Sequence, residues 1–151
     1  MLTTMAIQVA VVGSGTEWEQ AAEEIGRRLA ARGCTVVTGG LGEVMAAAHR
    51  GAKSAGGATL AVLPGESREA ANPWADHVVV TGIGHARNLA VAASGDAVIA
   101  VGGSYGTIAE MALALRLGRR VVALAGAPTV DGAIRAATAE EAVELALRDL
   151  G

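Results

Sequence analysis

The sequence has few aromatic residues and no excess of basic ones. It has no Phe, and its aromatic residues are Trp18, Trp74 and Tyr105. Lys and Arg number 12 against 15 Asp and Glu, which gives a formal net charge of −3. Nucleic-acid binding needs positive charge to neutralise phosphates, and single strands also need exposed aromatic rings for base stacking. We therefore expect no nucleic-acid partner.

Cysteine, histidine and lysine are also scarce. Cys34 cannot form an internal disulfide, and no Cys/His group has the spacing of a zinc site, so we expect neither a metal nor a resident cofactor. Cys34 opens a predicted strand, which is typical of a small buried side chain. Lys53 is the one lysine, and it lies at the predicted end of a helix, where a cation neutralises terminal carbonyls. Schiff-base chemistry is therefore not expected.

Long apolar runs are absent. The longest, such as 97–101 and 121–125, are interrupted by Gly or charge well before membrane-spanning length, and the N-terminus lacks the pattern of a secretory signal. We expect a cytoplasmic protein with no membrane partner. With 52% hydrophobic and 18% charged residues in 151, the composition predicts one folded domain over residues 1–151.

Short β-branched runs alternate with segments of helical apolar spacing, and Gly-rich loops separate them. The predicted strands are 7–12, 35–37, 59–63, 78–80, 96–101 and 120–124. The predicted helices are 18–30, 44–54, 85–94, 107–117 and 139–150. Strands that are apolar on both faces and alternate with helices indicate an α/β fold, a Rossmann-like doubly wound parallel sheet with helices on both faces.

Ligands bind such sheets at the carboxyl ends of the strands, where the strand order reverses, here between the first and fourth main strands. Glycine loops follow several of the predicted strands, and two of them lead into helix N-termini that favour a phosphate. The alternative is that these glycines only form tight turns. The candidate phosphate-binding residues are Gly13, Ser14, Gly15, Gly39, Gly40, Gly103, Ser104, Tyr105, Gly106 and Thr107.

Two common nucleotide motifs are absent from these loops. A dinucleotide fingerprint starting at Gly13 would need a third glycine where Trp18 stands, and no carboxylate directly ends the second strand at Thr38. Neither glycine loop contains the Gly-Lys-Ser or Gly-Lys-Thr of a P-loop. NAD, FAD and P-loop ATPase functions are therefore not expected.

Arg87 and Glu110 are the charged residues best placed to act at this edge. Arg87 enters one predicted helix, and Glu110 lies in the first turn of another. Spacing alone favours a different role for Glu110, because Thr107 and Glu110 fit a capping box. The pairs Thr16/Glu19 and Thr138/Glu141 fit one too.

Two further polar residues have simpler interpretations. His85 precedes Arg87 by two positions, but a loop histidine without a fixed partner is usually only solvated. Asp96 begins a strand at the end far from the site, so we expect it to fix local backbone.

One segment resembles a known family. Arg87-Asn88, Asp96 to Ala100, and Gly103-Ser104-Tyr105-Gly106-Thr107-Ile108-Ala109-Glu110 resemble the Arg-Lys, Asp-Ala-Phe-Ile-Ala and Pro-Gly-Gly-x-Gly-Thr-x-x-Glu stretches of the LOG family. These cytokinin-type nucleoside 5′-monophosphate phosphoribohydrolases were long described as possible lysine decarboxylases. Here Gly102, Ser104 and Asn88 replace the family's Pro, second Gly and Lys.

Other segments resemble a smaller LOG-like branch that includes molybdenum-cofactor carrier proteins. They are Gly40-Leu41-Gly42, Leu63-Pro64-Gly65-Glu66, Ala71-Asn72-Pro73 and 81–88. The resemblance implies hydrolysis of a nucleoside 5′-monophosphate to free base and ribose 5-phosphate, with Arg87 and Glu110 catalytic. The alternative that it implies is a non-catalytic carrier of a nucleotide or pterin phosphate. It also implies a homodimer or homotetramer, for which the helix 111–117 offers an apolar face that could equally be core.

Overall fold

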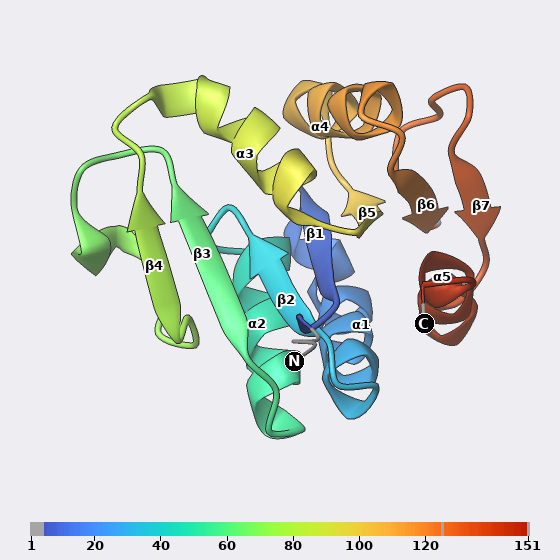
Figure 1. Ribbon diagram of the computed structural model, residues 1–151, viewed down its shortest axis with the longest axis horizontal. Coiled ribbons are helices and arrows are strands. Elements are labelled where there is room, and N and C mark those ends of the chain that lie inside the picture. The colour runs from blue at the N-terminus through green and yellow to red at the C-terminus, as the bar shows by residue number, and fades with distance from the viewer. Residues whose placement is uncertain (1–4, 125, 151) are drawn as a thin grey trace, which may run out of the picture.

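The computed structural model describes residues 5–124 and 126–150, and its strands form one parallel seven-stranded sheet (Figure 1). The strand order is β4-β3-β2-β1-β5-β6-β7. The strands are β1 (Gln8–Ser14), β2 (Thr35–Thr38), β3 (Thr59–Leu63), β4 (His77–Val80), β5 (Ala97–Gly102), β6 (Arg120–Leu124) and β7 (Ile134–Ala136). This confirms the Rossmann-like fold class and places the reversal of strand order between β1 and β5.

Helices cover both faces of the sheet (Figure 1). They are α1 (Glu19–Ala31), α2 (Val44–Ser54), α3 (Arg87–Ser94), α4 (Tyr105–Arg116) and α5 (Ala139–Leu147), with single 3₁₀ turns η1 (Thr16–Trp18), η2 (Arg68–Ala70) and η3 (Gly84–Ala86). Apolar side chains of α1, α2 and α5 pack on one face, and those of α3 and α4 pack on the other. Two cores therefore hold the strand ends of the central sheet in place.

Two glycines bring α1 and α2 together. A Cβ atom added to Gly26 would lie 2.0 Å from the carbonyl oxygen of Ala48, and one added to Gly51 would lie 1.9 Å from that of Glu23. Both contacts are with backbone, so neither position has room for a side chain. The close approach fixes α2, whose N-terminal loop reaches the edge of the sheet where the site lies.

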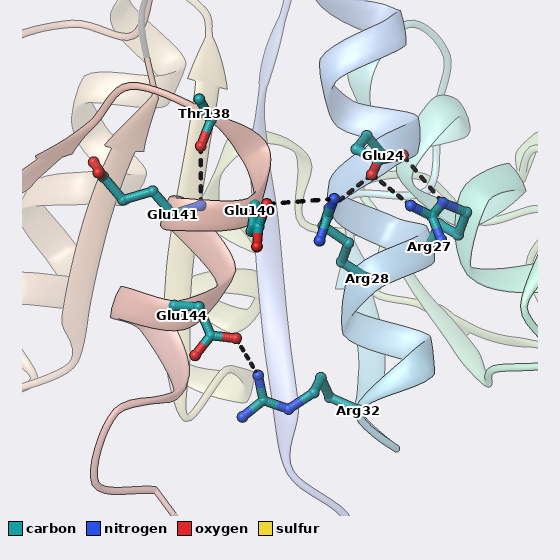
Figure 2. Close-up of polar contacts among 8 residues, drawn as sticks. All are labelled: Glu24, Arg27, Arg28, Arg32, Thr138, Glu140, Glu141 and Glu144. Carbon is teal, nitrogen blue, oxygen red and sulfur yellow. Dashed lines mark hydrogen bonds and ion pairs between the residues drawn. The ribbon is translucent and has the colours of Figure 1, made fainter.

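The α1 and α5 helices are also joined on the surface by ion pairs (Figure 2). Arg28 lies between Glu24, at 2.7 Å, and Glu140, at 3.8 Å, and Arg32 contacts Glu144 at 2.5 Å. These side chains are largely solvent-exposed, so each pair contributes less than about 1 kcal/mol to stability. The apolar packing of α1 and α5 is the main link between them.

Several element boundaries differ from the sequence predictions, and one strand was missed. The α4 helix begins at Tyr105 and not at Thr107, and α5 ends at Leu147, since Asp149 has a positive φ of 66°. The β7 strand was not predicted, because the alternation of Ile134, Arg135 and Ala136 over three residues is too short for a strand signal, and it forms by pairing with β6. In the described part of the chain no helix is long and apolar enough to cross a membrane.

Candidate functional site

A cavity of about 200 Å³ lies at the strand ends where the order reverses. Its walls come from the second half of β1, from single residues that follow β2 and β5, from Met45 of α2, and from the N-terminal halves of α3 and α4. The lining residues are Val11, Val12, Gly13, Ser14, Gly39, Met45, Arg87, Asn88, Ser104, Gly106, Thr107 and Glu110. Cavities that enclose a whole drug-sized ligand are usually larger, so this one suits a phosphate and a sugar with the rest of the ligand projecting outward.

The structure brings eight of the twelve sequence-predicted site residues to this cavity. The predicted residues outside its lining are Gly15, Gly40, Gly103 and Tyr105. Gly40 has φ of 81°, and an added Cβ would meet the side chains of Leu63 and Ala61, so its glycine is needed by the fold. Tyr105 is 88% exposed.

Two of the glycines that line the cavity, Gly13 and Gly106, differ in whether the fold requires glycine there. A Cβ at Gly13 would lie 1.8 Å from the carbonyl oxygen of Val101, so the approach of β1 to β5 requires glycine there. Gly106 lies inside α4, and the nearest atom to an added Cβ is Asn88 Nδ2 at 4.0 Å. Glycine weakens a helix and the fold does not require it at Gly106, so the space beside it is left open within the cavity.

The N-terminus of α4 opens onto this space, because its first turn lines the cavity. Ser104 is the N-cap, and its backbone N–H donates to Thr107 Oγ1 at 3.3 Å. The prediction that Thr107 and Glu110 form the capping box was therefore wrong, because the helix begins two residues earlier. The amides of a first helical turn have no partner within the helix and favour an anion.

The other two predicted capping boxes had different outcomes. At Thr138, the hydroxyl accepts from Glu141 N at 3.1 Å, which confirms the cap of α5 (Figure 2). At Thr16 the prediction was wrong, because α1 begins at Glu19 with Trp18 as its N-cap and no capping side chain.

Glu110 is a buried carboxyl group, 8% exposed, on the cavity wall. Burial raises its pKa to about 7, and the nearby Arg87 opposes that rise. A carboxyl group with this pKa is present in both protonation states at neutral pH. Because Glu110 does not cap α4, its carboxyl group is available to exchange a proton with a ligand.

Arg87 faces the same cavity and is held by the loop after β2. Its Nη2 donates to the carbonyl oxygen of Gly39 at 3.4 Å, its Nη1 donates to Asn88 Oδ1, and its buried Nε has no partner. Burial lowers its pKa, and Glu110 opposes this. An added Cβ at Gly39 would lie 2.6 Å from Arg87 Nη2, so glycine there makes room for the guanidinium.

The remaining polar candidates lie elsewhere. Lys53 Nζ donates to the carbonyl oxygen of Gly57 at 2.9 Å, and Asp96 accepts from Gln8 N at 2.9 Å, which confirms both expected structural roles. Cys34 is buried, as expected, and His85 is exposed outside the cavity lining.

A buried polar network that sequence reasoning missed supports the loop after β2. Trp74 N donates to Asn72 Oδ1, Asn72 Nδ2 lies 3.2 Å from His49 Nδ1, and His49 Nε2 lies 3.2 Å from Thr38 Oγ1. The same hydroxyl accepts from Gly40 N at 2.9 Å. His49 is fully buried, and this lowers its pKa to about 4. The network thus contains a neutral imidazole that fixes the loop.

Glu43 was also missed. It follows the glycines of the β2–α2 loop, and its Oε2 accepts from Gly15 N at 3.3 Å. No sequence pattern marks this contact, because it joins residues 28 positions apart through the fold.

A larger, open hollow of about 860 Å³ lies between the loop 66–75 and β4. Its lining contains no strand-end glycine loop and no first turn of an α-helix. The cavity between β1 and β5 is therefore the better candidate site.

Comparisons with known proteins find one similar sequence and several structures with the same fold. A protein of Archaeoglobus fulgidus, itself uncharacterized, is 42% identical over 140 residues, which cover 91% of this chain and 92% of that protein. The molybdenum cofactor carrier protein of Chlamydomonas reinhardtii is 33% identical with a TM-score of 0.87, covering 97% of this chain and 99% of that one. The molybdenum cofactor binding protein of Rippkaea orientalis is 28% identical with a TM-score of 0.91, covering 99% and 100%.

The model of the SLOG cluster4 family matches residues 6–148, which is nearly the whole chain. The LOG-like resemblance inferred from residues 87–110 is thereby confirmed, and so is the kinship with molybdenum-cofactor carriers. The protein belongs to the SLOG cluster4 family.

Proposed function

We propose that this protein hydrolyses the N-glycosidic bond of a nucleoside 5′-monophosphate, releasing free base and ribose 5-phosphate. The observation that supports this most is Glu110, a buried carboxyl group with a pKa of about 7, in the same cavity as a helix N-terminus and Arg87. A phosphate-binding helix end and a proton-exchanging carboxyl group are the two parts that this reaction needs.

The 5′-phosphate binds at the first turn of α4. Ser104, Gly106 and Thr107 of that region line the cavity, and first-turn amides together with the helix dipole favour an anion there. The open space beside Gly106 accommodates the phosphate oxygens. Ser14 and Gly13 line the facing wall and contact the sugar.

Glu110 and Arg87 then act at the anomeric carbon. The bond between C1′ and the base nitrogen breaks through a cationic sugar state, which the ionised Glu110 stabilises. The base nitrogen takes up a proton from solvent as the base leaves, and a water molecule adds its oxygen to C1′ and loses a proton to Glu110, which then returns that proton to solvent. Arg87 orients the leaving base and neutralises charge that develops there.

A second candidate function is carriage of a pterin phosphate without turnover. It is favoured by the fold similarity to the molybdenum cofactor carrier protein of Chlamydomonas reinhardtii and to the molybdenum cofactor binding protein of Rippkaea orientalis. The phosphate of a pterin ligand would use the same helix N-terminus. In that case Glu110 would contact the cargo without cleaving it.

Self-association belongs to the same proposal. Large apolar side chains are exposed on β4, on α3, on α4 and on the loop that joins β4 to α3. They are Val79, Val80, Ile83, Leu89, Tyr105 and Ile108. Exposed large apolar side chains are typical of an interface, so we infer a homodimer or homotetramer that buries them.

The test is a chromatographic assay of base release from AMP, GMP, CMP, UMP, IMP and an N6-modified AMP. We expect release from at least one of them by the wild-type protein and by Glu69→Gln, whose carboxylate is exposed outside the site. Glu110→Gln should lose turnover. No release from any nucleotide, together with thermal stabilisation by a pterin phosphate, would favour the carrier function.

A further inference from the structure

Glu43 has a backbone conformation that side chains rarely adopt. It has φ of 55° and ψ of −125°, and among the described residues it and Asp149 are the non-glycine residues with positive φ. This region is natural for glycine and strained for other residues. Glu43 is exposed, so no apolar packing compensates for the strain. Strain of this kind persists where a side chain is needed for another purpose.

The side chain of Glu43 reaches the glycine loop at the end of β1. Its Oε2 accepts from Gly15 N at 3.3 Å, and Gly15 directly follows Ser14 on the cavity wall. A second carboxylate packs on the same glycine, because a Cβ added to Gly15 would lie 2.3 Å from Glu17 Oε1. The loop that would otherwise offer a bare amide to an anion is therefore negatively charged.

The opposite wall of the cavity differs in charge. The first turn of α4 presents amides and the positive end of a helix dipole, and Arg87, at the start of α3, lines the same cavity and donates to the carbonyl oxygen of Gly39. The α4 end of the cavity therefore attracts an anion, whereas the carboxylate of Glu43 lies on Gly15, the residue that follows the lining residue Ser14. A ligand with a single phosphoryl group fits this arrangement, because its uncharged sugar hydroxyls can lie toward Glu43.

We propose that Glu43 determines specificity by rejecting a second phosphoryl group at the β1 loop, which restricts the ligand to phosphomonoesters. Nucleoside diphosphates and triphosphates, and ligands joined through a pyrophosphate, are disfavoured by repulsion from its carboxylate. The inference rests on the proposed function in one respect, the binding of the phosphate at α4. It holds for a hydrolase and for a carrier alike.

The test measures the affinities of AMP, ADP, inorganic phosphate and pyrophosphate by titration calorimetry. Glu43→Gln removes the charge and keeps the length of the side chain, and Glu69→Gln removes a charge outside the site. We expect Glu43→Gln to raise the affinity for ADP relative to that for AMP by about tenfold or more. The affinity for pyrophosphate relative to that for phosphate should rise by the same factor. The affinity for AMP should change little, and Glu69→Gln should behave as wild type.

The outcomes separate this inference from the proposed function. If Glu43→Gln leaves the ratio of the pyrophosphate affinity to the phosphate affinity unchanged, the inference is overturned, even if nucleotide affinities change. If that ratio shifts while AMP fails to bind the wild-type protein and no base is released, the specificity role stands and the nucleotide proposal fails.

A second variant tests the strain directly. Glu43→Gly places the residue that this conformation favours at position 43, so its melting temperature should equal or exceed that of the wild-type protein while pyrophosphate binding improves. A melting temperature well below that of wild type, with unchanged ligand preference, would assign the Glu43–Gly15 contact a structural role and overturn the inference.

Discussion

At the scale of single residues, Glu110 couples the candidate chemistry to stability. Its pKa is about 7 in the folded protein against 4.5 for an ordinary Glu, so the folded state binds its proton more tightly. The stability that this group contributes is present below pH 4.5 and is lost as the pH rises through about 7. The loss is on the order of 3 kcal/mol.

We therefore predict that Glu110→Gln stabilises the protein at about pH 8, because an uncharged amide replaces a buried carboxylate. At about pH 4.5 the variant and the wild type should have similar free energies of unfolding. Urea denaturation at the two pH values measures this. Equal or lower stability of the variant at pH 8 would contradict the burial of an ionised Glu110.

His49 has the opposite effect on stability. Its pKa is about 4 in the folded protein against an ordinary 6.5, so the unfolded state takes up its proton first as the pH falls. Stability is full above pH 6.5 and declines as the pH falls toward 4, by about 3 kcal/mol at most. Over the same range Glu110 makes the wild-type protein more stable, so the two trends partly cancel.

The Glu110→Gln background should reveal the His49 trend. There we predict that the free energy of unfolding falls between about pH 7 and pH 5, and that adding His49→Gln flattens this slope while lowering stability overall. The slope is measured by urea denaturation across that range. An unchanged slope in the double variant would show that another group causes it.

At the scale of secondary-structure elements, Gly106 and Gly26 form a matched pair. Both are helical glycines, but an added Cβ meets nothing closer than 4.0 Å at Gly106 and lies 2.0 Å from the Ala48 carbonyl oxygen at Gly26. Gly106→Ala should raise the free energy of unfolding by about 0.5–1 kcal/mol, because alanine favours a helix. Gly26→Ala should lower it by about 1–3 kcal/mol, because α1 and α2 must move apart.

Ligand binding should change in the opposite sense. The Cβ of Gly106→Ala occupies the space proposed for the phosphate, so we expect the thermal stabilisation by AMP or a pterin phosphate to be lost. Gly26 lies in α1, away from the cavity lining, so Gly26→Ala should keep that stabilisation. Retained ligand binding in Gly106→Ala would show that the phosphate does not bind beside α4.

The start of α4 also shows what sequence can predict at this scale. Apolar runs and glycine loops located β1 to β6, the five α-helices and the reversal of strand order, because burial on both faces imposes them locally, whereas β7 was missed. The spacing of Thr107 and Glu110 fits a capping box, but the end of β5 places Ser104 at the cap. The choice between overlapping capping patterns depends on where the preceding strand stops, which no local pattern specifies.

At the scale of the whole molecule, the candidate site was predictable in part. The motifs around Arg87 and Glu110 predicted that both residues lie at one site, and the fold brings both to the lining of one cavity. Glu43 and the His49–Asn72 network were missed, because their contacts join residues 28 and 23 positions apart and depend on the path of two loops. Such tertiary contacts leave no periodic trace in the sequence.

The proposed self-association is also tested on the whole molecule. Light scattering should give the mass of a dimer or tetramer, and Ile108→Arg, on the exposed face of α4, should lower that mass. Ile134 is similarly exposed but lies on β7, the edge strand at the other end of the sheet from β4. Ile134→Arg should therefore leave the mass unchanged. A monomeric wild-type protein would contradict the proposal.

The central claim is that Glu110 is the titrating group of a nucleoside 5′-monophosphate hydrolase. The most direct measurement is the rate of base release, as kcat, across about pH 5 to 9, with Glu110→Gln measured in parallel. We predict that kcat rises with a midpoint near pH 7, because Glu110 ionises there. Base release should be lost in Glu110→Gln. Turnover that persists in the variant, or no base release at any pH, would contradict it.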